Sequence, residues 1–140
     1  MQMTGIVSVF VLGCSEPSQD TSTPGVFYET TTATSDGSFV VSYTTDPSPL
    51  PPAAYFTVTA TVAAAGDTSS PLSGAVVVMD ADMPDHDHGM NVSPEVVDNG
   101  DGTHTGSPFL FHMTGDWRLR FAVTADGVTE VAEMYVDCCQ

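Results

Sequence analysis

Histidine and methionine side chains gather in one short stretch of the chain, the segment HDHGM. It places His86, His88 and Met90 at alternate positions. If this segment is extended, the three side chains project to one side, because successive side chains of an extended chain point to opposite faces. The intervening aspartates then face solvent. We therefore expect a metal site here, with two imidazoles and one thioether as ligands.

A second histidine–methionine pair, His112 and Met113, precedes the turn sequence TGD. The sequence predicts that this pair lies at the end of a strand. Neighbouring residues on a strand face opposite sides, so only one of the two is expected to join the first three. Met113 is the first choice, and His112 is a further candidate. Phe111 and Trp117 are expected to form an apolar wall beside the site.

The combination of imidazole and thioether favours copper. Thioether sulfur is soft and suits Cu(I), whereas imidazole suits copper, zinc and nickel alike. We predict copper, with Cu(I) favoured and zinc, bound through His and Asp, as the runner-up. The alternative is a structural or interaction module of the bacterial cell envelope without a metal. In that interpretation Pro84 and Gly89 shape the loop, and the histidines are hydrogen-bonded.

The sequence offers little support for catalysis. It contains no nucleophile elbow and no glycine-rich phosphate loop. Its paired carboxylates are clusters of aspartates without an apolar setting that would raise a pKa. We predict a binding protein and not an enzyme.

The chain is strongly acidic. It has 18 acidic residues, no lysine and two arginines, Arg118 and Arg120, for a net charge of −16. Such a chain repels phosphate backbones, so no nucleic-acid partner is expected. The charge either keeps a secreted protein soluble or attracts cations, and both interpretations stay open.

The N-terminal segment is typical of a bacterial lipoprotein. An apolar run over residues 6–12 is too short to span a bilayer but fits a signal peptide. The sequence VLGC, ending at Cys14, resembles a lipobox, although no Lys or Arg precedes the run. We predict a signal peptide over residues 1–13, then the lipidated Cys14 and a flexible tether over residues 14–25. The protein is then extracytoplasmic and membrane-anchored. The alternative is a buried N-terminal strand.

Cys138 and Cys139 are adjacent at the end of the chain. The pair could form a vicinal disulfide, pair between chains or bind a soft metal as thiolates. We favour a fourth interpretation, an uncommitted and exposed tail.

The elements that must position these residues are β-strands. Seven runs rich in Val, Thr, Phe and Tyr alternate with turn-forming segments. In one of them Trp117, Leu119 and Phe121 alternate with arginines, so its aromatic face must point into a core. We predict an all-β domain over residues 26–140, an immunoglobulin-like β-sandwich of about seven strands. The runs cover residues 38–45, 55–64, 74–81, 94–98, 103–113, 117–125 and 128–137.

Two further expectations concern residues outside the candidate site. Met79 and Met134 are expected in the core, and Met83 is expected to pack beside Pro84. The segment DNGDGT lacks the ligand spacing of a calcium loop and contains hairpin-turn dipeptides, so we expect a turn there.

Three segments, MPDHDHGMN, GDGTH and FLFHMTGDWRLRFAV, resemble the YtkA-like domain family. The match lies within residues 76–136, under half of the chain. The family pattern is a Met-Pro-x-His-x-His-Gly-Met loop and a later Phe-x-Met-Pro-Gly-x-Trp hairpin. The matching loop positions are Met83, Pro84, His86, His88, Gly89 and Met90, and the hairpin positions are Phe111, Met113, Gly115 and Trp117.

The resemblance implies a small extracytoplasmic β-sandwich, often lipid-anchored and related in fold to copper-handling domains. It also implies copper binding, delivery or tolerance at the envelope, with a protein partner in copper transfer or respiratory-oxidase assembly. Two positions depart from the pattern. Thr114 replaces the usual proline, which affects the turn. His104 stands where an aromatic residue is common, and the departure either adds a ligand or has no functional meaning.

Overall fold

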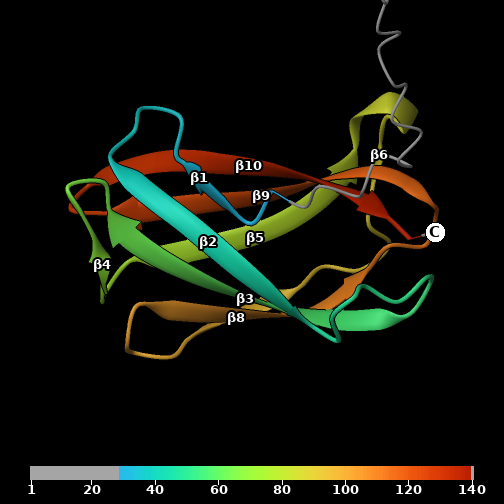
Figure 1. Ribbon diagram of the computed structural model, residues 1–140, viewed down its shortest axis with the longest axis horizontal. Coiled ribbons are helices and arrows are strands. Elements are labelled where there is room, and N and C mark those ends of the chain that lie inside the picture. Colours follow the sequence, from blue (N-terminus) through green and yellow to red (C-terminus); the bar gives the residue numbers. More distant parts are fainter. Residues whose placement is uncertain (1–28, 140) are drawn as a thin grey trace, which may run out of the picture.

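The computed structural model describes residues 29–139, which form ten β-strands and one short 3-10 helix (Figure 1). Within these residues no helix is long and apolar enough to cross a membrane. The predicted signal peptide, Cys14 and the tether lie outside the described residues. The elements are β1 (Thr31–Ala33), β2 (Phe39–Asp46), β3 (Tyr55–Ala64), β4 (Asp67–Pro71), β5 (Val76–Met83), η1 (Pro84–His86), β6 (His88–Gly89), β7 (Glu95–Asp98), β8 (Thr103–Leu110), β9 (Gly115–Ala125) and β10 (Val128–Cys138).

The strands form two antiparallel sheets that face each other as a sandwich (Figure 1). The first sheet has six strands in the order β1-β2-β3-β8-β7, and β4 pairs with β3. The second has four strands in the order β10-β9-β5-β6. The prediction of an all-β sandwich is therefore confirmed.

The seven predicted runs correspond to β2, β3, β5, β7, β8, β9 and β10. The prediction missed β1, β4 and β6, which have three, five and two residues. These strands are too short or too polar to show an alternating pattern, and they exist because a longer neighbour offers its backbone hydrogen bonds.

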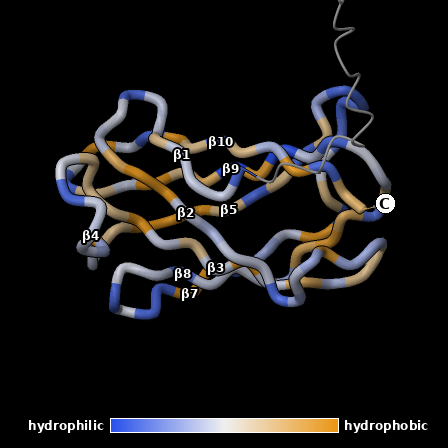
Figure 2. Tube along the Cα trace, viewed as in Figure 1, coloured by the Kyte–Doolittle hydropathy of each residue, from blue (hydrophilic) through white to orange (hydrophobic). Residues whose placement is uncertain are grey.

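The core lies between the sheets, and both contributing faces follow the predicted alternation. Phe56 and Val58 on β3 are buried, as are Trp117 and Phe121 on β9. Figure 2 shows hydrophobic residues along the strands and hydrophilic ones at the loops on both ends. Burial of each large side chain contributes about 1.5–3 kcal/mol to folding. Met79, Met83 and Met134 are buried as expected.

The DNGDGT segment is a turn between β7 and β8, as predicted. The Asn99 N–H donates to the Thr103 carbonyl at 3.0 Å. The carboxylates of Asp98 and Asp101 accept hydrogen bonds from the backbone N–H groups of Gly100 and Thr103 at 2.8 and 3.0 Å. These aspartates close the turn on itself, which is the usual role of Asp in such sequences.

Two local expectations about the candidate site are wrong. The segment HDHGM is not extended, because η1 turns over Pro84–His86 and Asp87 adopts a left-handed conformation with φ of 52°. The strand before it also continues to Met83. His112 and Met113 do not lie on a strand, because β8 ends at Leu110. Pro84 starts the turn, since its fixed φ suits the first position of a helix.

Candidate metal site

Three histidines from two separate loops lie together at one end of the sandwich. We call His86, His88 and His112 the histidine cluster. The His88 ring centre is 6.0 Å from that of His86 and 5.1 Å from that of His112. Two imidazoles bound to one tetrahedral ion through bonds of about 2.0 Å have ring centres about 5 Å apart. The separation of His88 and His112 therefore suits a shared ion.

Strand pairing brings these loops together. β6 folds back on β5 with Met83 opposite His88 and Asp82 opposite Gly89. β5 also pairs with β9, the strand that follows the loop of His112. The second sheet therefore carries both loops on the same end.

One nitrogen of His88 is held and the other is free. Its Nδ1 lies 3.1 Å from the carbonyl oxygen of Gly89. A carbonyl oxygen only accepts hydrogen bonds, so Nδ1 carries the proton in this contact and Nε2 keeps its lone pair. The Nε2 atom is buried and has no hydrogen-bond partner. A backbone carbonyl that holds one ring nitrogen while the other stays open is the usual arrangement of a metal-binding histidine.

His112 has a similar free nitrogen. Its Nδ1 atom is buried without a hydrogen-bond partner. Buried polar atoms of proteins are nearly always paired, so two such atoms on neighbouring rings call for an explanation.

An aromatic wall supports the two rings, as the sequence predicts. Phe111 and Trp117 are both buried and stack with centroids 4.5 Å apart and planes 9° apart. The rings of His88 and His112 meet Trp117 edge to face, at 5.8 and 5.5 Å. The Trp117 Nε1–H also donates to the Met113 carbonyl at 2.9 Å, which fixes the loop that carries His112.

The predicted methionine ligands differ in their setting. Met90 is half-buried, packs against the core and donates its backbone N–H to the Ala81 carbonyl at 3.3 Å. Met113 has 42% of its surface exposed, and its carbonyl, rather than its thioether, makes the contact with Trp117. The structure thus brings His112, more than Met113, to the cluster.

Met83 is a candidate thioether that sequence reasoning assigned to packing alone. It lies directly opposite His88 in the β5–β6 pair, and directly opposed residues of antiparallel strands share one face. Met83 is also 1% exposed. The sequence showed only that this methionine begins the Met-Pro loop. The register of β5 and β6 was needed to place it opposite His88.

A shallow acidic cavity of about 480 Å³ borders His88. Its charged lining includes Asp80, Asp82, Asp87 and both arginines. Arg118 donates to both carboxylate oxygens of Asp82, at 2.9 and 2.5 Å. This hydrogen bonding lowers the pKa of Asp82, so the carboxylate stays charged and remains committed to Arg118. Asp82 is therefore not a free ligand.

The possible donors at this end of the sandwich are imidazoles, with the Met83 thioether opposite His88. Over residues 29–139, with Cys138 and Cys139 joined as a disulfide, no three His, Cys, Asp or Glu side chains are grouped so that they could hold a metal ion. The closest set is the pair His88 and His112 with methionines nearby. Zinc sites in proteins normally use three or four N, S or O ligands of the grouped kind, whereas thioethers suit Cu(I).

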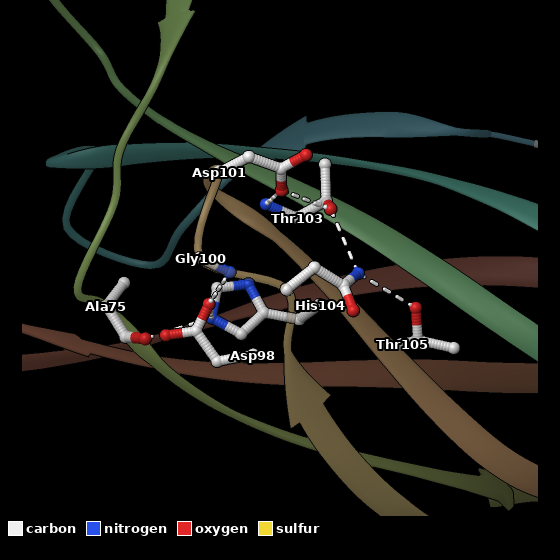
Figure 3. A network of polar contacts seen from close by, with 8 residues as sticks. Ala75, Asp98, Gly100, Asp101, Thr103, His104 and Thr105 are labelled. Atoms are coloured by element: carbon white, nitrogen blue, oxygen red, sulfur yellow. Dashed lines mark hydrogen bonds and ion pairs between the residues drawn. The ribbon is translucent and has the colours of Figure 1, made fainter.

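His104 lies at the other end of β8 and belongs to a separate polar network (Figure 3). It is 1% exposed, and its Nε2 lies 2.9 Å from the Ala75 carbonyl and 3.7 Å from a carboxylate oxygen of Asp98. The ring joins β8 to the start of β5 and to β7. The Nδ1 of His104 is also buried without a hydrogen-bond partner, but the ring lies at the other end of the strand from the histidine cluster and contacts the start of β5 through the Ala75 carbonyl.

The cysteine pair is not an exposed tail, so that interpretation is wrong. Cys138 is fully buried as the last residue of β10, and Cys139 is half-buried against the core. The two form a vicinal disulfide. Pairing of Cys138 with Gly115 holds the end of β10 in the sheet, which explains the burial.

Comparison of the chain with models of protein families, with curated proteins and with solved structures gave no match.

Proposed function

We propose that this chain is a copper-binding domain of the bacterial cell envelope, which binds, delivers or sequesters Cu(I) and catalyses no reaction. The carrying observation is the pair of buried, unpartnered nitrogens, His88 Nε2 and His112 Nδ1, on rings 5.1 Å apart. Two imidazoles beside a buried indole, with the Met83 thioether opposite His88, offer nitrogen donors and a soft sulfur donor but no carboxylate. Such a site favours a monovalent soft ion over hard divalent ions.

The resemblance to the YtkA-like family supports the proposal, because its loop and hairpin motifs include His88 and border His112. Membership of that family is itself part of the proposal. The acidic surface near His88 supplies a second argument. It raises the local concentration of cations beside the two imidazoles.

The test is a Cu(I) titration under anaerobic conditions against a chromophoric Cu(I) chelator. It uses the full chain with Cys14→Ser and with the vicinal disulfide intact. We expect His88→Ala and His112→Ala each to weaken binding by roughly ten- to a hundred-fold. His86→Ala should weaken it less, because that ring is exposed and farther away.

Asp85→Asn is the matched control, since it removes a charge from the same turn without touching an imidazole. Met83→Leu and Met113→Leu identify the thioether. Equal, weak binding by the parent and both histidine variants would contradict the proposal and favour the metal-free structural or interaction module.

We also propose that the sandwich is immunoglobulin-like. The chain crosses between the sheets after β4, after β6 and after β8, so consecutive hairpins alternate between layers. Such crossings are typical of two-sheet Greek-key domains. An experimentally determined strand order that differs from this one would contradict the assignment.

The proposed location of the domain at the membrane surface depends on lipid anchoring at Cys14. We expect the bacterial product to partition with membranes and to carry a mass increase on an N-terminal Cys14 peptide. Cys14→Ala should abolish both, because a lipidated cysteine is the only residue that the motif modifies. Recovery of Cys14→Ala in the same membrane fraction, without a mass change in the parent, would contradict anchoring.

A further inference from the structure

A small cavity of about 60 Å³ joins the candidate metal site to the vicinal disulfide. It is lined by His112 and Met113 from the loop before β9, by Cys138 and Cys139, and by Phe111. His112 therefore has two neighbours of chemical interest. Its ring lies beside His88, and it borders the same cavity as the two sulfurs. Figure 1 shows the end of β10 at the same end of the sandwich as β6.

The fold holds the two cysteines firmly at this cavity. Cys138 lies opposite Gly115 in the β9–β10 ladder, one of eleven register pairs between these strands. The Cys139 sulfur lies 3.6 Å from the Pro51 carbonyl. The disulfide is thus a fixed part of the cavity wall, and of its two residues Cys139 is the half-buried one while Cys138 is fully buried.

The chemistry of the pair depends on its oxidation state. As a disulfide, the sulfurs are weak ligands. One thiolate of a dithiol reductant attacks the disulfide, forms a mixed disulfide with one cysteine and releases the other cysteine as a thiol. The second thiol of the reductant then displaces the remaining cysteine, and the reductant leaves as a cyclic disulfide. The two electrons and two protons from the dithiol convert the pair to two thiols. On binding Cu(I) the thiols release their protons to solvent and coordinate as thiolates, which are the ligands that Cu(I) prefers.

We propose that Cys138 and Cys139 are a redox-gated second half of the copper site. When reduced, their thiolates bind Cu(I) together with His112, and when oxidised they withdraw and leave the imidazole site alone. This inference rests on the proposed function, and it adds a regulation to it. Reduction by a dithiol loads the domain with Cu(I). When an external disulfide exchanges with the two thiolates, it accepts their two electrons and leaves as two thiolates, the Cys138–Cys139 bond re-forms, and the affinity falls so that the Cu(I) can pass to a partner.

The test compares the oxidised and the dithiol-reduced full chain, both with Cys14→Ser, in the same anaerobic Cu(I) competition. We expect reduction to lower the apparent Kd at least ten-fold and to add an ultraviolet thiolate-to-copper charge-transfer band. Cu(I) should also shield the two thiols from alkylation. In the reduced protein, His112→Ala should diminish the gain, whereas His86→Ala should not.

Cys138→Ser with Cys139→Ser should abolish the gain, provided that circular dichroism shows the variant folded. If that variant does not fold, the alkylation assay still tests whether the two thiols bind Cu(I), because it needs no cysteine substitution. Equal Kd values and equal alkylation rates with and without copper would overturn the inference. An increase in Cu(I) affinity on reduction that His112→Ala leaves unchanged would also overturn it.

The two proposals fail separately. If Cu(I) binding to the oxidised protein does not depend on His88 and His112, the proposed function is contradicted. Binding that depends on these histidines but not on reduction overturns the redox gate alone.

Discussion

At the scale of single residues, Trp117 does more than fill the core. It stacks on Phe111, meets His88 and His112 with its ring, and donates its indole N–H to the Met113 carbonyl. One buried side chain thereby fixes two candidate ligands that come from different loops. Outer contacts of this kind orient metal ligands and tune their affinity.

Replacement of Trp117 by phenylalanine tests this role. Trp117→Phe keeps an aromatic ring against Phe111 but loses the indole N–H, so we expect a loss of about 1–3 kcal/mol in the free energy of unfolding. Cu(I) affinity should fall by about ten-fold, because the loop of His112 is no longer held. Urea unfolding and the chelator competition measure the two effects. Phe109→Leu, a core change outside the site, should lower stability without lowering affinity; a parallel loss there would contradict a specific role for Trp117.

A second residue, Glu130, joins distant parts of the chain. Its buried carboxylate accepts hydrogen bonds from the hydroxyls of Ser38 and Thr34 and from the Ser38 N–H at 3.1 Å. Hydrogen bonding by Ser38, and then by Thr34, lowers the pKa of Glu130 in the folded protein. The carboxylate thus ties β10 to the turn between β1 and β2.

This contact predicts a pH dependence. A lowered folded-state pKa stabilises the protein above the unfolded value, about 4.3 for glutamate, and the stabilisation is lost as pH falls through the folded value. We expect the urea midpoint of the parent to fall between about pH 5 and pH 3, and Glu130→Gln to show a lower midpoint at pH 6 with a flatter profile. Glu95→Gln, at an exposed position of β7, is the control. Identical profiles for the parent and Glu130→Gln would refute the assignment.

At the scale of elements, the turn η1–β6 sets the position of His88. Asp87 connects η1 to β6 in the left-handed conformation, with φ of 52° and ψ of 42°. This conformation costs most L-residues about 1–2 kcal/mol, but Asp and Asn tolerate it and Gly adopts it freely. The shape of the loop therefore depends on a backbone state that few side chains allow.

Substitutions at Asp87 separate backbone shape from charge. Asp87→Gly should keep or raise stability and keep Cu(I) affinity, although it removes a negative charge. Asp87→Val should lower the free energy of unfolding by about 1–2 kcal/mol and weaken Cu(I) binding, since a β-branched residue resists positive φ. Thermal melts and the chelator competition provide the readouts. Asp85→Val, in the ordinary helical backbone of η1, is the matched control, and an equal loss there would argue against the backbone explanation.

At the scale of the whole molecule, the net charge of −16 is barely compensated. Both arginines lie on β9 on the solvent face of the second sheet. Arg118 binds Asp82, and Arg120 lies 3.3 Å from Glu133. The many remaining carboxylates repel one another. Folding brings them closer than in the unfolded chain, and this repulsion destabilises the compact state.

Salt should therefore stabilise the protein. Screening shortens the Debye length from about 30 Å at 0.01 M to about 3 Å at 1 M ionic strength, so the Tm should rise over this range. Differential scanning calorimetry in NaCl and in KCl measures it, and the two salts should act alike because screening depends on ionic strength. A Tm that falls with salt would mean that the arginine ion pairs outweigh the repulsion.

The sequence by itself determined the architecture of the domain. Alternation of buried and exposed residues has a period of two and is a local property, so β3 and β9 could be placed with their buried faces before any contact was known. The residue types of the site were equally visible, because the histidines and methionines crowd two short segments.

Only the tertiary structure decided which of these side chains meet. The period of two fails where Asp87 turns left-handed and where β8 ends before His112, and both depend on pairing with distant strands. Register then set Met83 opposite His88, and the β9–β10 ladder buried Cys138 near His112. Contacts between segments far apart in the chain follow from sheet pairing, and no local pattern contains that information.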